Sequence, residues 1–426
     1  MPEINKRSVM AGSIGNMLEW YDFAVFGFFA SAISAQFFPS DDRLAGLLNT
    51  FAVFAVGYLA RPLGGFLFGH LGDRIGRKRA LQISIVAMAI PTTLIAVLPT
   101  HAEIGVWAAV LLAVLRLAQG FSVGGEFIGS VCYLVEVAPP GKRGLYGSFA
   151  VFSTVGGMLL GSAVATGLSL TLSPEAIADW GWRLPFLGGL VLGLVGWTLR
   201  RGLLETPAFQ EILDKGKTLA HPARQAMRQM PREIFLVGVM VILLGVGVYT
   251  LFIWMPTYLT TIVEPPVSHA LVVNTLAMIL MIALMPVAGR LTDRFGYKPV
   301  LAAAMIVTAL TVYPLFVWID TGGLVAMIVA MIVFAFINGF LQGPTPVAMA
   351  AQFPVELRFS GMAVGYNITV AVFGGTAPLV ATWLIKETGD LASPAWYLAA
   401  VAVASLIATL SLKGCYHLEG SGDGGS

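Results

Sequence analysis

Five charged side chains stand inside long apolar stretches of the 426-residue sequence, where an ionised group costs free energy. Glu19 and Asp22 lie in the first stretch, Arg61 in the second, and Arg116 and Glu126 in the fourth. Burial favours the protonated form of a carboxyl group, and a nearby arginine opposes that effect. Such a set can take up a proton when its arginine is drawn to an anionic ligand. We therefore expect Glu19, Asp22 and Glu126 to carry protons.

Distance along each helix separates the five side chains into two levels. With a rise of about 1.5 Å per residue, Glu19, Arg61 and Glu126 lie roughly 15 Å from the end with the basic loops, Asp22 roughly 20 Å and Arg116 roughly 28 Å. This predicts one cluster of two acids with Arg61, and a second set of Asp22 and Arg116. Because a guanidinium donates two parallel hydrogen bonds to a carboxylate, we expect Arg116 to bind the ligand. The alternative is a permanent network that only stabilises these helices.

Uncharged polar side chains in the same stretches could complete a binding site. Asn16, Glu19 and Asp22 are spaced three residues apart and share roughly one helix face. The second half of the chain has no clear charge at depth, but it offers hydrogen-bonding and aromatic groups. Each of these could line a cavity or could only pack helices together. The candidates for ligand contact besides Arg116 are Asn16, Tyr21, Gln119, Tyr249, Asn338, Gln342 and Asn367.

The stretches that must position these groups are too apolar for a soluble protein. Hydrophobic residues make up 57% of the chain and charged residues 11%, against about 25% charged in ordinary globular domains. This composition excludes a cytosolic enzyme, a nucleic-acid-binding protein and a disordered chain. We predict an all-α membrane protein with twelve transmembrane helices, near residues 9–38, 46–70, 80–98, 104–135, 145–171, 183–200, 234–260, 268–289, 299–318, 323–352, 360–386 and 394–412.

The basic residues predict how the chain lies in the membrane. Most of the 25 lysines and arginines fall on one side if the helices alternate, and that side should be the cytoplasm. Both termini are then cytoplasmic. The predicted organisation is a six-helix bundle over 1–200, a cytoplasmic linker over 201–233 and a second six-helix bundle over 234–417. The Gly- and Ser-rich tail over 418–426 is excluded from the fold.

The two halves repeat one another at an offset of about 220 residues. The loop GHLGDRIGRK (69–78) in the first half matches GRLTDRFGYK (289–298) in the second. Six spans is an even number, so the halves share one orientation and are related by an axis along the membrane normal, with a site expected between them. The loop carboxylate could bind a base or cap a helix across the interface, whereas its bases could be ordinary cytoplasmic charges. We predict a gate latch formed by Asp73, Arg74, Arg77, Arg143, Asp293, Arg294 and Arg358.

These motifs resemble those of the major facilitator superfamily over nearly the whole chain. The loop at 69–78 is similar to the family signature, and Arg116-x-x-Gln119-Gly120 is similar to its second motif. The segments GNMLEWYDF (15–23), RPLG (61–64), GGE (124–126), WGWRLPF (180–186) and ETPAF (205–209) resemble the metabolite:proton symporter family. The second loop departs from the signature at Tyr297 and Pro299, which suggests a more degenerate latch.

The resemblance implies a proton-coupled symporter that works by alternating access in a bacterial inner membrane. Members carry citrate, 2-oxoglutarate, shikimate, proline or betaine. Arg116 and the acids of the first span favour a small organic anion, a di- or tricarboxylate such as citrate. The alternative is a zwitterionic osmolyte such as proline or betaine, whose quaternary ammonium could be caged by Tyr249, Trp254 and Tyr258.

Other classes of protein fit the sequence less well. An enzyme is not expected, because the five histidines fall at loops or span ends and neither HExxH nor GxSxG occurs. A receptor or scaffold would leave the buried charges unexplained. We expect no cofactor other than the proton as coupling ion, no metal and no nucleic-acid partner. The expected form is a monomer in the lipid bilayer that binds a small solute.

Overall fold

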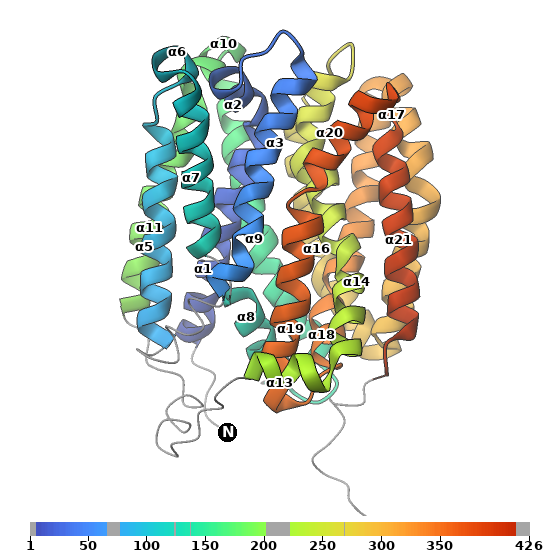
Figure 1. The fold of residues 1–426 in the computed structure, drawn as a ribbon. Coiled ribbons are helices and arrows are strands. Elements are labelled where there is room, and N and C mark those ends of the chain that lie inside the picture. The colour runs from blue at the N-terminus through green and yellow to red at the C-terminus, as the bar shows by residue number, and fades with distance from the viewer. Residues whose placement is uncertain are drawn as a thin grey trace, which may run out of the picture.

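The computed structural model describes residues 6–65, 77–122, 125–136, 138–201, 222–267 and 269–414, and within these ranges every regular element is helical. Nine helical segments of this described part are long and apolar enough to cross a membrane. The helices run side by side, and α1 begins and α21 ends at the same end of the molecule (Figure 1). The prediction of an all-α membrane protein is confirmed.

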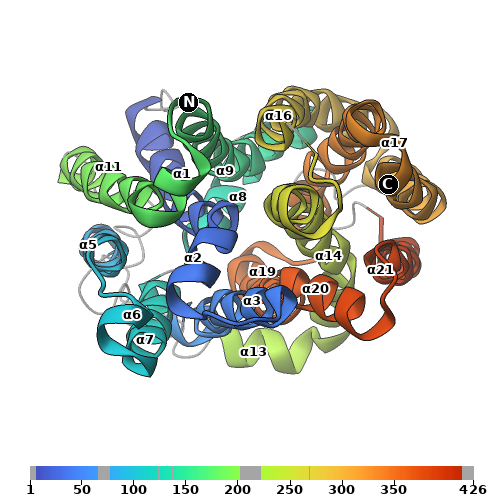
Figure 2. The ribbon, with the colours of Figure 1, turned by 90° about the horizontal axis from the view of Figure 1, so that it is seen from above.

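The first half of the chain forms one group of helices (Figure 2). The expected first span is divided into α1 and α2 by a turn at Phe29, and the fourth is represented by α7 and α8. The elements are α1 (Lys6–Phe28), α2 (Ala30–Phe37), α3 (Arg43–Leu59), α5 (Arg77–Ala96), α6 (His101–Ile104), α7 (Val106–Ser122), α8 (Glu126–Glu136), α9 (Arg143–Thr171), α10 (Pro174–Ala176), the π-helical turn η1 (Ile177–Gly181) and α11 (Arg183–Arg201).

The second half forms a matching group that contains three π-helical turns, η2 to η4. Such wide turns inside α-helices occur often at functional sites. The elements are α13 (Pro222–Gln229), α14 (Pro231–Val248), η2 (Tyr249–Trp254), α15 (Met255–Thr257), η3 (Tyr258–Ile262), α16 (Ala270–Phe295), α17 (Tyr297–Gln342), α18 (Thr345–Ala350), α19 (Val355–Thr369), η4 (Val370–Gly374), α20 (Ala377–Thr388) and α21 (Ser393–Ser411).

Helix α17 holds two of the predicted spans. At Gly323 the backbone has φ 56° and ψ −141°, a region that residues with a side chain rarely adopt. The chain reverses direction there, so that Tyr297–Thr321 and Gly323–Ala350 are separate membrane-length segments. All twelve predicted spans therefore coincide with helical segments.

The two groups touch along two lines of contact. Helix α9 packs on α16 at one edge of the interface, and α3 packs on α20 at the other (Figure 2). Asp293 on α16 accepts hydrogen bonds from the backbone N–H groups of Gly144 and Leu145 at 2.6 and 2.9 Å. These contacts lie at the end where α1 begins and α21 ends (Figure 1).

The opposite end of the molecule is also closed. The ammonium group of Lys386 on α20 lies 2.6 Å from the carboxylate of Asp42 at the start of α3. The hydroxyl groups of Ser31 and Thr261, one from each half, are 2.8 Å apart. Described side chains therefore join the halves at both ends of the molecule.

Candidate functional site

Glu19 and Arg61 form a buried ion pair, as the first of the two predicted clusters requires. Their Oε1 and Nη2 atoms are 2.8 Å apart. The guanidinium also lies over the ring of Trp20, 5.1 Å from its centroid. Removing one partner of a buried ion pair costs about 3–5 kcal/mol, since the other charge is left uncompensated. The side chain of Glu126, expected in this cluster, lies outside the described part of the chain.

The second cluster joins Asp22 to Arg116 through a third side chain. Arg116 donates to Gln119 Oε1 at 2.9 Å, and Gln119 Nε2 donates to Asp22. Thr92 donates a second hydrogen bond to the same Asp22 oxygen at 2.7 Å. The Asp22–Arg116 set predicted from depth is therefore present, with Gln119 between the two charges.

This second cluster is sealed by aromatic rings. The Arg116 guanidinium carbon lies 4.6 Å from the ring centroid of Phe23 and 4.4 Å from that of Phe26. Arg116 is fully buried, and its Nε and Nη2 atoms have no hydrogen-bond partner; neither has Asp22 Oδ1. Arg116, our leading candidate for ligand contact, thus does not reach the cavity between the halves in this conformation.

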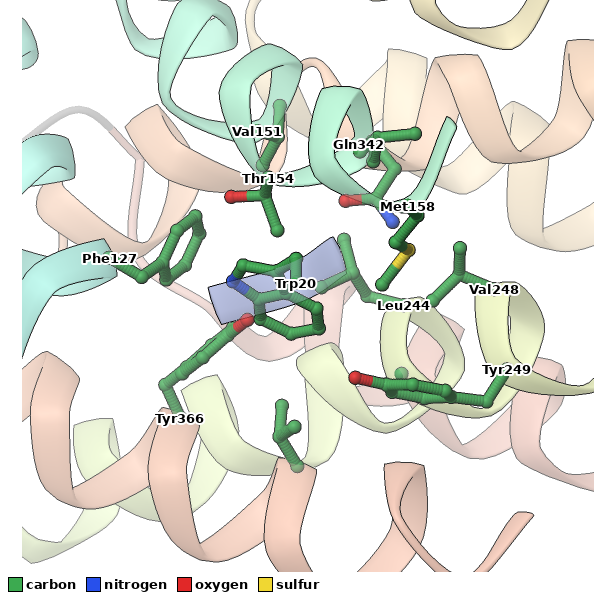
Figure 3. A pocket seen from close by; sticks show the side chains of 13 residues that line it. Trp20, Phe127, Val151, Thr154, Met158, Leu244, Val248, Tyr249, Gln342 and Tyr366 are labelled. Carbon is green, nitrogen blue, oxygen red and sulfur yellow. The ribbon is translucent and has the colours of Figure 1, made fainter. Parts of the chain in front are cut away.

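A narrow cavity lies between the two halves (Figure 3). None of the described side chains that line it carries a formal charge. Its free volume is about 20 Å³, room for roughly one water molecule, so the cavity must widen before a small solute can bind. The lining comes from both halves: Trp20, Phe127, Val151, Thr154, Val155, Met158, Leu244, Gly245, Val248, Tyr249, Gln342, Tyr366 and Val370.

Two of the expected ligand contacts, Tyr249 and Gln342, line this cavity, and the others do not. Several of the expected side chains that do not line the cavity form hydrogen bonds with neighbouring groups. Asn16 donates to the hydroxyls of Ser130 and Ser153, Tyr21 to the carbonyl of Pro185, and Asn338 to the carbonyl of Phe334. Gln119 is engaged with Asp22, and Asn367 is buried elsewhere in α19.

Two of the three residues expected to cage the alternative solute do not line this cavity. Trp254 and Tyr258 stack on each other, with ring centroids 4.9 Å apart, and donate to Thr382 and to the carbonyl of Leu391. Only Tyr249 of the three reaches the cavity. Its hydroxyl is 2.6 Å from that of Tyr58 in the other half.

Sequence reasoning missed most of the cavity wall. Trp20, Phe127, Thr154 and Tyr366 face the space but were not among the candidates. A signal existed for Trp20, because it stands between Glu19 and Tyr21 in the span with two acids. An aromatic residue in an apolar span is ordinarily a packing residue, so its type alone does not reveal this role.

The gate residues are described in part. Asp73 and Arg74 lie outside the described residues, as does the side chain of Arg77. In the second half the Asp293 carboxylate does cap the start of α9, at Gly144, so the departures at Tyr297 and Pro299 do not prevent a latch.

Two further gate residues make contacts across or near this end. Arg358 forms an ion pair with Glu136 of the other half, with 2.7 Å between Nη1 and Oε1. Arg294 packs over the ring of Phe295, and Arg143 is the first residue of α9.

Comparisons with known proteins agree with this architecture. Residues 8–233 match the family described as "Sugar (and other) transporter", and residues 265–417 match the "Major Facilitator Superfamily". The xylose transporter XylE of E. coli, in a partially occluded inward open conformation, has a TM-score of 0.73 with 18% identity, and the match covers 95% of this chain and 96% of XylE. The proton:xylose symporter XylE bound to 6-bromo-6-deoxy-D-glucose has a TM-score of 0.75 with 19% identity, covering 97% and 98% of the two chains.

Curated relatives are more similar in sequence. The proline/betaine transporter of Salmonella typhimurium is 37% identical over 421 residues, covering 96% of this chain and 83% of the relative. The glycine betaine/proline/ectoine/pipecolic acid transporter OusA of Dickeya dadantii is 37% identical over 420 residues with the same coverage. These matches confirm the expected resemblance and the expectation that the chain is not an enzyme. The chain belongs to the major facilitator superfamily of membrane transporters.

Proposed function

We propose that this transporter is a proton-coupled symporter that imports a small zwitterionic osmolyte such as proline or betaine. The observation that carries the proposal is the uncharged cavity. A di- or tricarboxylate would bring two or three negative charges into a space whose described lining offers no cation, and burying an unpaired charge is costly. A zwitterion has no net charge. The alternative solute class therefore replaces the organic anion that the sequence favoured, in line with the names of the relatives.

The aromatic rings of the cavity suit the cationic end of such a solute. Tyr249, Tyr366 and Phe127 present rings to the space (Figure 3). A quaternary ammonium over the face of an aromatic ring gains about 0.5–2 kcal/mol per ring when it is desolvated. Betaine carries its positive charge on a trimethylammonium group, and proline carries it on a ring nitrogen bonded to two carbon atoms, so both can use such contacts.

The buried acids are proposed to hold the transported proton. Asp22 has one carboxylate oxygen without a partner, and Glu19 relies on Arg61 as its counter-ion. A proton on either acid compensates for buried negative charge, and its release requires water or a nearby base. The candidate Glu126 stays in this proposal with them. Movement of Arg61 toward the solute carboxylate would leave Glu19 ready to accept a proton.

Alternating access would proceed by rocking of the two halves, 1–200 and 234–417, about this cavity. The contacts between the halves at the two ends would have to break in turn during such a cycle. We place both termini in the cytoplasm of a bacterial cell and the chain in its inner membrane as a monomer.

Uptake into proteoliposomes tests the proposal. Purified protein is reconstituted, the outside is made acidic, and labelled proline, betaine, citrate and 2-oxoglutarate are offered in turn. We expect proline or betaine to accumulate and a protonophore to abolish the accumulation. Uptake of citrate or 2-oxoglutarate alone would restore the organic-anion hypothesis. Uptake that ignores the pH gradient would contradict proton coupling.

A further inference from the structure

The indole N–H of Trp20 is a buried donor with no acceptor among the described residues. Its side chain is 2% exposed and lines the cavity, and its Nε1 atom has no hydrogen-bond partner in the part of the chain that the structure describes. Buried polar groups in folded proteins nearly always have a partner, so each exception asks for an explanation. Figure 3 shows the indole nitrogen on the side of Tyr366 and Thr154, at the edge of the cavity. A ligand in the cavity can supply the missing acceptor.

The surroundings of the Trp20 ring favour an anionic acceptor. The Arg61 guanidinium lies over the ring at 5.1 Å, and the ring of Tyr249 is stacked at 6.2 Å with an interplanar angle of 25°. A cation over an aromatic face draws electron density from the ring, which strengthens the N–H as a donor. The same cation makes this ring a poor host for a second positive charge. Trp20 is thus suited to the negative end of a zwitterion.

Another polar group of the cavity can bind the solute at a different point. The Gln342 amide makes no hydrogen bond within the described part of the chain and lies across the cavity from Tyr366 (Figure 3). The hydroxyl of Tyr249, in contrast, is held by Tyr58. The rings of Tyr249 and Phe127 are left for the cationic end, because no described arginine lies over either of them.

We propose that Trp20 is the specificity-determining residue that donates its indole N–H to the carboxylate of the transported zwitterion. This assignment rests on the proposed function and deepens it. It explains how a cavity without a lining charge can select a solute with a carboxylate over an otherwise similar cation. Betaine and choline both carry a trimethylammonium group, but only betaine carries a carboxylate. The pair therefore isolates the contribution of the indole N–H.

The chain contains a matched control for this residue. Trp182 is also fully buried, its Nε1 also has no partner, and the guanidinium of Arg183 lies 4.5 Å from its ring centroid. It packs against Phe37 and Phe186 and does not line the cavity. Within the described residues an indole without a hydrogen-bond partner lies beneath an arginine at two positions, and of these two Trp20 is the one that lines the cavity.

The test is competition against labelled betaine in proteoliposomes with the variants Trp20→Phe and Trp182→Phe. Phenylalanine keeps an aromatic ring and removes the N–H. We expect Trp20→Phe to raise the KM for betaine about 10- to 100-fold, the range for loss of a hydrogen bond to a charged group. Inhibition by choline should not change, and Trp182→Phe should leave both values unaltered. A betaine KM within twofold of the unmodified protein in Trp20→Phe would overturn the assignment.

Two measurements keep the assignment open to refutation. If the Trp20→Phe variant does not give a monodisperse protein, competition is measured with the unmodified protein instead. The assignment requires that this protein bind betaine at least about tenfold more tightly than choline. Equal competition by betaine and choline would refute the role of Trp20 as a hydrogen-bond donor to the solute carboxylate. If the unmodified protein transports neither betaine nor proline, the proposed function fails and this assignment fails with it. Transport of betaine with an unaffected Trp20→Phe variant removes the assignment alone.

Discussion

Asp22 shows how a buried carboxyl group can be held ready for a proton. Its Oδ2 accepts from Thr92 and Gln119, and its Oδ1 has no partner. An ionised carboxylate with an unsatisfied oxygen inside a protein costs free energy, and a proton on that oxygen removes much of the cost. Gln119 separates this carboxyl from Arg116, so neither charge is neutralised by direct contact. The arrangement therefore favours exchange of a proton over a permanent ion pair.

Replacing Asp22 with asparagine should uncouple transport from the pH gradient. An amide cannot hold the transported proton, but it keeps the size of the side chain. We expect gradient-driven accumulation in proteoliposomes to fall at least about tenfold, while exchange of labelled for unlabelled solute without a gradient continues. The control is Asp179→Asn, an exposed acid at the end of the molecule. Full accumulation by Asp22→Asn would show that another group carries the proton.

At the scale of elements, α9 and α16 approach so closely that only glycine fits at the contact. A Cβ atom on Gly144 would lie 2.4 Å from the carbonyl oxygen of Gly289 and 2.9 Å from the Asp293 carboxylate. The same carboxylate accepts from the N–H of Gly144. The end of the molecule predicted to face the cytoplasm closes by this backbone contact, and a methyl group would hold it apart.

The variant Gly144→Ala should therefore shift the transporter toward the state open at this end. We expect faster labelling of a cysteine placed at Glu136, the residue paired with Arg358 across the same end, by about threefold or more. The natural cysteines Cys132 and Cys415 are first replaced by serine. Gly167→Ala in the same helix is the matched control, since nothing lies within 4 Å of its Cβ position. Equal labelling in both variants would show that this glycine contact does not set the closure.

The sequence predicts the elements better than it predicts the site. Span positions follow from apolar length alone, which explains why even the turn at Gly323 falls at the first residue of a predicted span. Depth along the helices correctly groups Glu19 with Arg61 and Asp22 with Arg116. Depth does not reveal which neighbour a side chain faces. Tyr21 and Asn338 were therefore assigned to the cavity although nearby carbonyl groups bind them.

The same reasoning could not identify the wall of the cavity. Whether Trp20 or Trp182 faces a space depends on how two bundles, far apart in the sequence, fit together. Both residues are buried tryptophans beside an arginine, and both lie in motifs that resemble the symporter family. Only the packing of the second half against the first distinguishes them.

For the whole molecule, the two closed ends differ in the strength of their contacts. One end is held by the backbone approach of α9 to α16 and by Asp293 at a helix start. The other is held by the pair of Asp42 and Lys386, which are about half and one third exposed. It is also held by hydroxyl contacts between the halves, Ser31 to Thr261 at 2.8 Å and Ser162 to Thr275 at 2.7 Å. Solvent screens exposed ion pairs and weakens them. The Asp42–Lys386 pair should therefore add only modestly to the closure of this end.

The Asp42–Lys386 ion pair should stabilise contact between the two halves at its end of the molecule equally at every physiological pH. The hydrogen bond from Lys386, together with that from the N–H of Ala45, lowers the pKa of Asp42 below its ordinary value of 3.8. A lowered pKa means that the pair stabilises the closed state above the ordinary pKa and loses this effect only as the pH falls through the lowered value. Between pH 5 and pH 8 Asp42 stays ionised, so the ion pair cannot sense the gradient that drives transport.

The variant Asp42→Asn tests this claim because asparagine still caps α3 but has no charge. With the natural cysteines replaced, a cysteine at Ser31, which contacts Thr261 of the other half, reports opening of this end. We expect its labelling to become about two- to fivefold faster, by the same factor at pH 5.5 and pH 7.5, and the pH dependence of uptake to stay unchanged. Lys386→Gln should reproduce both results, since it breaks the same pair from the other half. A change that is confined to one of the two pH values would mean that Asp42 titrates during transport and belongs with the proton-carrying acids.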